Sequence, residues 1–478
     1  MRRRRPKIAA ALAALALTAA ACSSSGDGTT NPDDSTAAPA TDVGERADST
    51  DTPDADVVEP SDSTAAPDAD AGEPSDTSDT NDADQGPMDL GAGVTDDTIT
   101  IGFTYLDFDA IRDQGIVDIN HGPYDQHVQT MVEHINSQGG INGRDLEVVA
   151  LPIDPIDASS RQATCLELTE DRQVFAVLGA IRGDDVLCYT EQHETIAIPF
   201  AGMTQERIER ANAPYATINV DDPTKIAAFV ADVTERGLLD GATVAVHSSN
   251  TADVAADIAI PELQGAGIDV EFESLIQGDG SVGGAAAELS VNVEAMRAKG
   301  VDTVFVVGDA LVAVNTFIGE GFFPTLFFTE QGSAAAAAAR ADLSAFPAVY
   351  TFGGFSDISR YQEATFLAEC APVWDAAHPD DVVLDPNDVA DGESNHVVGL
   401  GNVCRALTLF VAVADATGLN LNNDTFGAAM DTLGDFELPG YGSASLEAGK
   451  YGAQDNLILW TFDPDNAESD NGLVQVEG

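Results

Sequence analysis

The sequence predicts an α/β protein with two doubly wound lobes. From about residue 97, short apolar runs of strand length alternate with longer stretches whose apolar residues recur at helical spacing. The same alternation starts again after residues 215–219. Residues 95–478 are enough for two lobes, since a single core rarely grows past roughly 250–300 residues.

The first run of alternation predicts four strands and the helices between them. The predicted strands cover residues 98–105, 146–152, 174–179 and 196–200. The predicted helices cover residues 124–136, 159–170 and 184–194. In the first of these helices Val128, Met131, Val132 and Ile135 share one face, as in a helix that packs on a sheet.

The second run predicts the same kind of layered lobe. Its strands are expected over residues 243–247, 270–276, 303–307 and 326–329. Its helices are expected over residues 224–236, 253–263, 285–299 and 311–319. Ligands bind at the carboxyl ends of the strands in such sheets, so the natural site is a cleft to which both lobes contribute.

Residues 1–22 are typical of a secretory signal peptide. A basic head, Arg2 to Lys7, precedes the apolar run Ile8 to Leu17, which is too short to span a bilayer well. Small residues then lead to Cys22, the pattern of a bacterial lipoprotein in which the cysteine receives acyl chains. We expect a lipid-anchored protein on the extracytoplasmic face of the bacterial cell membrane. Ordinary secretion with an incidental cysteine stays open.

Residues 23–94 predict a disordered tether, because Ser, Thr, Ala, Pro, Gly and Asp dominate and cannot bury enough apolar surface to order the segment. The whole chain carries 81 acidic and 21 basic residues, a net charge of −60. Such a surface repels nucleic acid and anionic lipid, which excludes nucleic-acid binding and a lipid-binding face. It fits a soluble protein of a salty habitat.

Four cysteines remain besides Cys22. An even number in an oxidising compartment favours disulfides, and four cysteines allow three pairings. We expect the sequence-local pairs, Cys165 with Cys188 and Cys370 with Cys404. A zinc site is the alternative, but no CxxC or HxxxH spacing supports it.

Several segments carry a resemblance to a known family. ITIGFTY and INSQGGINGRDLEVVALPID open the first run, and VFAVLGA, IPFAGMT, GATVAV, MRAKGVDTVFVVGD and FFTEQG follow in order. Together they resemble type I periplasmic solute-binding proteins, in the leucine/isoleucine/valine-binding branch of ABC importers, over nearly all of residues 95–462. The Cys165–Cys188 pair also falls where this branch carries a disulfide.

The resemblance implies a specific architecture and role. Two Rossmann-like lobes would be joined by a hinge with three chain crossings, with lobe 1 over residues 95–220 and 354–438 and lobe 2 over residues 221–353 and 439–478. Ligand binding would close the lobes. The implied ligand is a small polar metabolite, an amino acid or a related amide or carboxylate. The implied partner is an ABC permease, and we expect a monomer without cofactor.

The ligand residues of the first lobe carry over only in part. The family usually reads Gly-x-x-x-Ser after the third strand, where a hydroxyl and backbone amides hold a ligand carboxylate. This chain reads GAIRGD over residues 179–184, so Arg182 would hold an acidic group in place of the serine. Pairing with nearby carboxylates is the alternative for Arg182. The family's Gly-Ala-Thr becomes Gly202-Met203-Thr204, in which Thr204 keeps the hydroxyl and is expected to face the cleft beside Met203.

Two aromatic positions of the second lobe are lost. The family's aromatic residue matches Ala252, with Asn250 beside it, and a second matches Ala310, with Asp309 beside it. Asn250 and Asp309 are therefore the candidate contacts at these positions. The loss of both aromatic clamps argues against a branched-chain amino acid.

A glutamate that holds the ammonium of an amino acid in the family matches Glu330, which Gln331 follows. Both are candidate ligand contacts, and a carboxylate so close to an apolar strand needs a reason to be there. The alternative is an exposed loop acid. Tyr105 and Phe355 end other strands, where they would flank the ligand or belong to the core.

Two other functions are the alternatives to solute binding for an importer. Residues 278–283 fit GxGxxG after a strand, which would suit a secreted dinucleotide-dependent oxidoreductase. The motif lies in the middle of an α/β run, the solute-binding family has a Gly/Asp-rich loop at this place, and no GxSxG or HExxH motif occurs. We therefore expect no enzyme. A ligand sensor of the same fold that signals to a membrane partner stays open.

Overall fold

The computed structural model describes residues 88–108, 120–154, 157–181, 183–200, 202–249, 251–276, 282–308, 310–354, 357–390, 392–466 and 470–476. The chain divides into a unit of residues 1–80 and a unit of residues 81–478, and every described residue belongs to the second unit. Several predicted features lie outside the described residues. They are the signal peptide with Cys22, the tether up to residue 87, most of the GxGxxG motif, and Arg182, Asn250, Asp309 and Phe355.

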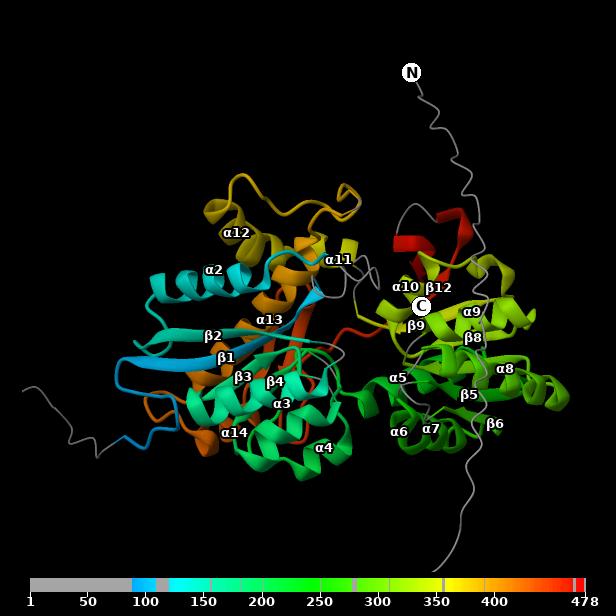
Figure 1. Ribbon diagram of the computed structural model, residues 1–478, viewed down its shortest axis with the longest axis horizontal. Helices are drawn as coiled ribbons and strands as arrows, with labels where there is room; N and C mark the ends of the chain where they lie inside the picture. The colour runs from blue at the N-terminus through cyan, green and yellow to red at the C-terminus, as the bar shows by residue number, and fades with distance from the viewer. Residues whose placement is uncertain are drawn as a thin grey trace, which may run out of the picture. The chain divides into compact units, whose positions relative to one another are not determined.

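The first sheet of the described chain is parallel, with the order β2-β1-β3-β4. Its strands are β1 (Thr98–Leu106), β2 (Asp145–Ile153), β3 (Ala176–Gly179) and β4 (Ile196–Pro199). Each lies within two residues of its predicted bounds. Parallel strands need crossover connections, which the helices between them supply (Figure 1).

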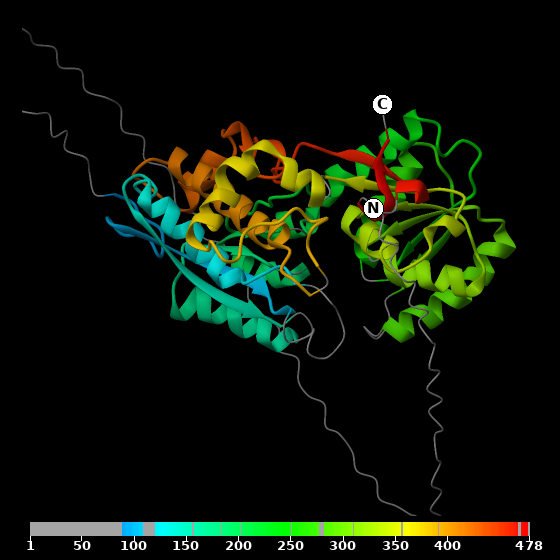
Figure 2. The same cartoon turned by 90° about the horizontal axis from the view of Figure 1, so that it is seen from above.

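Two hydrophobic layers cover this sheet, because successive residues of a strand point to opposite faces. On β3, Ala176 and Leu178 join one layer and Val177 joins the other. The first layer includes α2 (Tyr124–Ser137), α12 (Ala371–Ala377), α13 (His396–Ala416) and α14 (Asn423–Met430). The second includes α3 (Ala158–Leu166), η1 (Glu167–Asp171) and η3 (Cys188–Gln192). Although α2 and α13 are far apart in sequence, they lie side by side, cyan beside orange, in Figure 1 and in Figure 2.

The second sheet has the order β13-β12-β9-β8-β7-β5-β6. Its parallel strands are β5 (Val244–Ser248), β6 (Val270–Leu275), β7 (Thr303–Val307), β8 (Thr325–Phe328) and β9 (Val349–Gly353). β12 (Ile458–Phe462) and β13 (Leu473–Gln475) extend one edge as antiparallel strands. These two fall outside the strand–helix alternation read from the sequence, because they follow the last helix.

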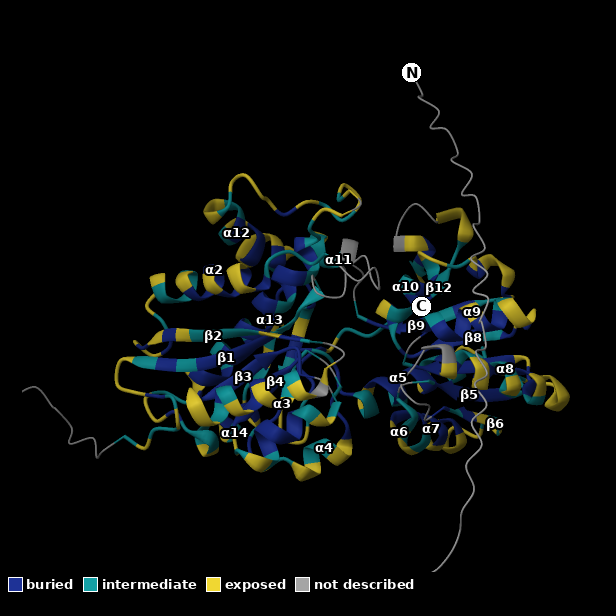
Figure 3. Cartoon of the chain, viewed as in Figure 1, coloured by how far each residue is buried: buried dark blue, intermediate teal, exposed yellow. Residues whose placement is uncertain are grey.

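The second sheet is also covered on both faces. On β7, Val304 and Val306 face one hydrophobic layer, and Phe305 and Val307 face the other. The first layer contains α8 (Val282–Lys299), α9 (Ala310–Glu320) and α10 (Gln331–Ala338). The second contains α5 (Asp222–Glu235), α6 (Ala252–Val254), η4 (Ala255–Ala259) and α7 (Ile260–Gly265). Figure 3 shows helices that carry exposed residues on one side and buried residues on the other, as amphipathic helices on a sheet should.

Some predicted helices are interrupted by π-helical turns. The helix expected over residues 253–263 is divided into α6, η4 and α7, and Pro261 lies in the first turn of α7. Proline lacks the N–H of the regular ladder and crowds the preceding turn, which accounts for the break. Pro372 follows the π-helical turn η6 (Phe366–Cys370) in the same way. The helix expected over residues 184–194 is replaced by η2 (Gly183–Asp185) and η3.

The chain passes between the two sheets three times, near residues 217–222, 353–357 and 453–458. The first and third passages are hydrogen-bonded: the Thr217 N–H donates to the Tyr451 carbonyl and the Ala453 N–H to the Thr217 carbonyl, both at 2.9 Å. A hairpin of β10 (Gly434–Leu438) and β11 (Gly442–Leu446) precedes the third passage.

The third boundary between the two lobes lies further along the chain than the sequence suggests. Residues 439–453 were expected in the second lobe, yet Tyr441, Ala444, Leu446 and Ala453 are buried in the hydrophobic cluster of the first sheet. The glycines and polar residues around this hairpin hide its membership, since they show no periodicity. We therefore propose that the second lobe resumes near residue 454.

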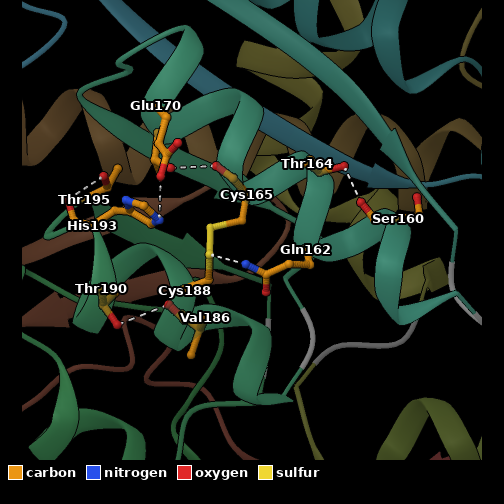
Figure 4. Close-up of a disulfide and its surroundings, with 11 residues drawn as sticks. Ser160, Gln162, Thr164, Cys165, Glu170, Val186, Cys188, Thr190, His193 and Thr195 are labelled. Atoms are coloured by element: carbon orange, nitrogen blue, oxygen red, sulfur yellow. Dashed lines mark hydrogen bonds and ion pairs between the residues drawn. A yellow bond between two sulfur atoms is a disulfide. The ribbon is translucent and has the colours of Figure 1, made fainter.

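Both expected disulfides are present. Cys165 on α3 joins Cys188 on η3, with 6.4 Å between their Cα atoms (Figure 4). Cys370 on η6 joins Cys404 on α13, with a Cα separation of 6.1 Å. Each bond ties together elements of the first lobe, and the Cys370–Cys404 bond holds α13 against η6, which follows the second crossing.

The helix α13 is long and apolar enough to cross a membrane by length and composition alone. Most of its residues are buried within the first lobe, where Leu407, Phe410 and Val413 pack in the hydrophobic cluster. We therefore interpret α13 as the central core helix of this lobe.

Candidate functional site

A cavity of about 560 Å³ lies at the carboxyl ends of the strands in the second sheet. The strand order β6-β5-β7-β8-β9 reverses between β5 and β7, and ligands of doubly wound sheets bind at such a point. The cavity lining includes Thr251 after β5, Gly308 after β7, Glu330 after β8 and Gly354 after β9. The topology and the cavity thus indicate the same place.

Residues of the first lobe and of the crossings complete the lining. Tyr441 donates its hydroxyl to the Asn219 side-chain oxygen at 2.6 Å, and Asn219 in turn donates to the Phe200 carbonyl. The Arg360 guanidinium lies over the Tyr441 ring, 5.2 Å from its centroid. Asn219, Arg360 and Tyr441 therefore form one connected polar wall of the cavity.

Lys225 places a buried positive charge in the lining. It lies in the first turns of α5, whose N-terminus is capped by the Asp221 side chain. Its ammonium pairs with Asp222 at 3.0 Å and with Glu330. Burial alone would lower the pKa of Lys225, but the carboxylates of Glu330 and Asp222 outweigh it and raise the pKa. Lys225 therefore stays charged, and its ion pair holds the Glu330 carboxylate near the carboxyl end of β8.

The N-terminus of α10 opens into the same cavity. Gln331, Gly332 and Ser333 form its first turn and line the cavity, and Glu330 at the N-cap makes no side-chain capping bond. The first N–H groups of a helix have no partner within the helix and carry its positive dipole end. This turn is suited to a ligand carboxylate.

Two glycines at the carboxyl end of β9 allow close packing of the residues that line the cavity. A Cβ at Gly354 would lie 2.0 Å from Nε2 of Gln454, and one at Gly353 would lie 2.9 Å from Cβ of Gln331. The Gln454 amide is held by a 2.9 Å bond to the Asn456 carbonyl. Larger residues at 353 and 354 would displace Gln331 or Gln454, both of which line the cavity.

The structure brings together only some of the residues predicted from the sequence. Glu330 and Gln331 line the cavity, as do Thr251, Gly308 and Gly354, which neighbour the undescribed Asn250, Asp309 and Phe355. Arg182 likewise lies outside the described residues. The ligand roles of these four residues stay predictions.

Three other predicted residues are absent from the lining of this cavity. Met203 is fully buried in the hydrophobic layer under α3, and Thr204 caps α4 (Gln205–Arg210) by accepting from the Arg207 N–H at 3.4 Å. Tyr105 lines a different cavity in the first lobe. Their contact with a ligand also stays a prediction.

Lys225, Arg360 and Gln454 were not anticipated from the sequence. Lys225 offers the one usable signal, a lysine after Asp221-Asp222-Pro223 at the start of an otherwise apolar helix. Arg360 and Gln454 come from segments distant in sequence, so only the folded chain shows their place.

One group of the described residues has the spacing of a metal site. Ligand atoms of Cys165, Cys188 and His193 lie within 4.8 Å of one another. The two sulfurs are bonded to each other, and a metal ligand must be a thiolate. This group therefore carries no metal proposal while the disulfide is formed.

The solved structures that resemble this chain share one architecture. A periplasmic binding protein type 1 from Bordetella pertussis has a TM-score of 0.57 at 13% identity, over 80% of this chain and 100% of that one. An ABC transporter substrate-binding protein from Desulfitobacterium hafniense in complex with leucine has a TM-score of 0.54 at 14% identity, over 80% and 100%. A solute-binding protein of an ABC transporter from Rhodopseudomonas palustris in complex with 3,4-dihydroxybenzoic acid has a TM-score of 0.55 at 15% identity, over 80% and 97%.

The chain has the type I periplasmic binding protein fold. The expected fold class is thereby confirmed: two doubly wound α/β lobes with three crossings. No protein-family model and no curated protein matches the chain. At such low identities the likeness establishes the fold, and function must come from the site.

Proposed function

We propose that this protein is the extracytoplasmic solute-binding component of an ABC importer, and that it binds an amino acid or a related small carboxylate or amide in the cavity at the ends of β5, β7, β8 and β9. The observation that carries the proposal is that one cavity contains both hydrogen-bond donors for a carboxylate and an acidic side chain for an ammonium group. The first turn of α10 offers N–H donors for a carboxylate, and Glu330, one residue earlier, offers a carboxylate for an ammonium.

The charges in the cavity favour a ligand that carries both signs. Lys225 and Arg360 line the cavity together with Asp222 and Glu330, so an anionic group and a cationic group of one ligand would each find an opposite charge there. The Glu330 side chain is 43% exposed, and a carboxylate has acceptor positions beyond the one that Lys225 engages. The solved relatives include proteins bound to leucine and to an aromatic acid, which supports a ligand with a carboxylate.

We propose that ligand binding is coupled to closure of the hinge between the lobes. The three crossings contain Asn219, Gly354 and Gln454, which line the cavity. A ligand that contacts these residues would shift the hinge toward its closed conformation, and a permease would recognise that conformation.

The test compares amino acids with their deaminated analogues, measured by calorimetric titration and by thermal shift. We expect one amino-acid class to raise the melting temperature, since a ligand at 100 times its dissociation constant adds about 2.7 kcal/mol. Glu330→Gln should lower the affinity for that amino acid at least tenfold and should remove the preference over the deaminated analogue. Glu288→Gln, an exposed acid of α8 outside the cavity, is the matched control. Unchanged affinity in Glu330→Gln would refute the assignment.

The membrane anchor is proposed from the sequence alone. Acylation of Cys22 would hold the binding unit at the outer face of the cytoplasmic membrane, with the segment from residue 23 to residue 87 as the tether. The expected tether is shorter than residues 23–94, because Leu90 and Val94 pack in the first lobe. Cys22→Ala should move the protein from the membrane fraction to the soluble fraction, as judged by fractionation and immunoblotting. A wild-type protein that is already soluble would contradict lipidation.

A further inference from the structure

A second cavity, of about 300 Å³, lies in the first lobe. It opens beside the carboxyl ends of β1 and β2, and its lining includes Leu106 and Pro152 at those ends. Among the described residues, it shares no lining residue with the cavity that contains Glu330. The proposed function makes no use of it.

Aromatic rings dominate the second cavity. Tyr105, Phe108, His121 and Tyr124 all line it. The two tyrosine rings are stacked with their centroids 5.8 Å apart, His121 meets Tyr124 edge-on at 6.2 Å, and Phe108 meets His121 edge-on at 4.9 Å. These contacts join the four rings into one aromatic cluster along the cavity.

The charge of the described part of the lining is negative. Asp107 and Asp125 line the cavity, and its described lining contains neither lysine nor arginine. Burial is the main cause that raises the pKa of the Tyr105 phenol, and the carboxylates of Asp125 and Asp107 raise it further. The faces of aromatic rings carry negative charge density as well, so rings and carboxylates attract the same kind of ligand.

A bound anion is the alternative to a cation, because the N-terminus of α2, which would attract negative charge, lies at this cavity. Pro123 occupies the N-cap and has no N–H to offer. Asp125 lies in the first turn, where its carboxylate already complements the positive end of the helix. A bound anion would also face Asp107. The lining therefore disfavours anions.

We propose that this second cavity binds a small organic cation of the alkylammonium or quaternary ammonium class. The ammonium group lies against the rings of Tyr105, Tyr124 and Phe108, and Asp125 supplies the countercharge. The volume of the cavity is at the lower end for small-molecule sites, which suits a compact amine.

Choline and dimethylbutanol, in which a carbon replaces the charged nitrogen, are the matched probes. Calorimetric titration of the full protein should show choline binding at least tenfold more tightly than dimethylbutanol. Tyr105→Ala and Asp125→Asn should each weaken choline binding at least fivefold. Asp125 is exposed, so its variant tests the proposal even if Tyr105→Ala disturbs folding. Glu288→Gln should bind choline as the wild type does.

Two results would overturn the proposal. If choline binds no better than dimethylbutanol, or not at all, the cavity does not recognise a cation. If Glu330→Gln abolishes choline binding whereas Asp125→Asn leaves it intact, choline occupies the other cavity. Failure of amino-acid binding in the wild type would reject the proposed function and leave this cation site standing, so the two failures are distinguishable.

Discussion

His247 shows at the residue scale how a buried titratable group limits stability in acid. Its ring is fully buried on β5, with Nδ1 3.1 Å from the Ser274 carbonyl, and burial lowers its pKa to about 4. The unfolded chain takes up a proton near pH 6.5 while the folded chain does not, so stability is full above pH 6.5 and falls as the pH drops toward 4. At pH 5 this costs about 2 kcal/mol, from ~1.4 kcal/mol per pH unit.

The expected result is that His247→Gln loses about 2 kcal/mol less than the wild type between pH 7 and pH 5. Urea unfolding should be followed in a Trp374→Phe background, where Trp460 in β12 reports the second lobe alone. The comparison at pH 7 measures the packing cost of the substitution separately. Equal acid losses in the two proteins would show that His247 does not control the transition.

Single residues also mark the limit of what the sequence predicts about the site. Glu330 was identifiable because a carboxylate follows an apolar strand at a position that the family resemblance marks. Lys225 was not, since its importance depends on Glu330, 105 positions away, and no local pattern brings them together. Arg360 and Tyr441 meet for the same reason only in the folded chain.

At the scale of elements, the Cys165–Cys188 bond should stabilise the face of the first sheet that α3 and η3 cover. Closing a loop of 23 residues constrains the unfolded chain by about 3 kcal/mol on the chain-entropy estimate. The double substitution Cys165→Ala/Cys188→Ala should lower the free energy of unfolding of the first lobe by about that amount. A Trp460→Phe background isolates this lobe, because Trp374 on α12 is then the sole tryptophan.

The second lobe provides the control for this substitution. It contains no cysteine in the sequence, so its transition, reported by Trp460 in a Trp374→Phe background, should stay unchanged. A loss of stability in both lobes would mean that the lobes unfold as one unit. A loss below about 1 kcal/mol in the first lobe would show that the bond constrains little.

Elements differ in how far their local sequence determines them. The strands β1–β8 were predictable because each is a short segment whose apolar residues are either continuous or, as in β6, separated by polar ones. The strand β11 was assigned to the second lobe, although its residues Ala444 and Leu446 are buried in the hydrophobic cluster of the first sheet, among helices that lie elsewhere in the sequence. Tertiary packing, which no local pattern records, decides such boundaries.

The charge of the whole molecule leads to a final prediction. The whole chain carries a net charge of −60, and the tether holds part of it. The acidic residues that remain on the folded lobes repel one another and favour the expanded chain at low salt. Screening should therefore raise the melting temperature by at least 3 °C between 20 mM and 500 mM NaCl, or roughly 2–3 kcal/mol at ~0.8 kcal/mol per degree. Calorimetric scans of the purified protein would measure this rise in the melting temperature.

The shape of the salt dependence separates screening from preferential exclusion of salt. The screening length falls to about 8 Å at 0.15 M, so most of the rise should occur below ~0.2 M NaCl and then level off. Exclusion of a stabilising solute strengthens burial steadily with concentration, and sucrose serves as the uncharged comparison. A flat response below 0.2 M, or a linear rise that matches sucrose, would show that the acidic surface is not what limits stability. In either case the acidity would have to be explained by solubility, because repulsion among the carboxylates would then be too weak to oppose folding.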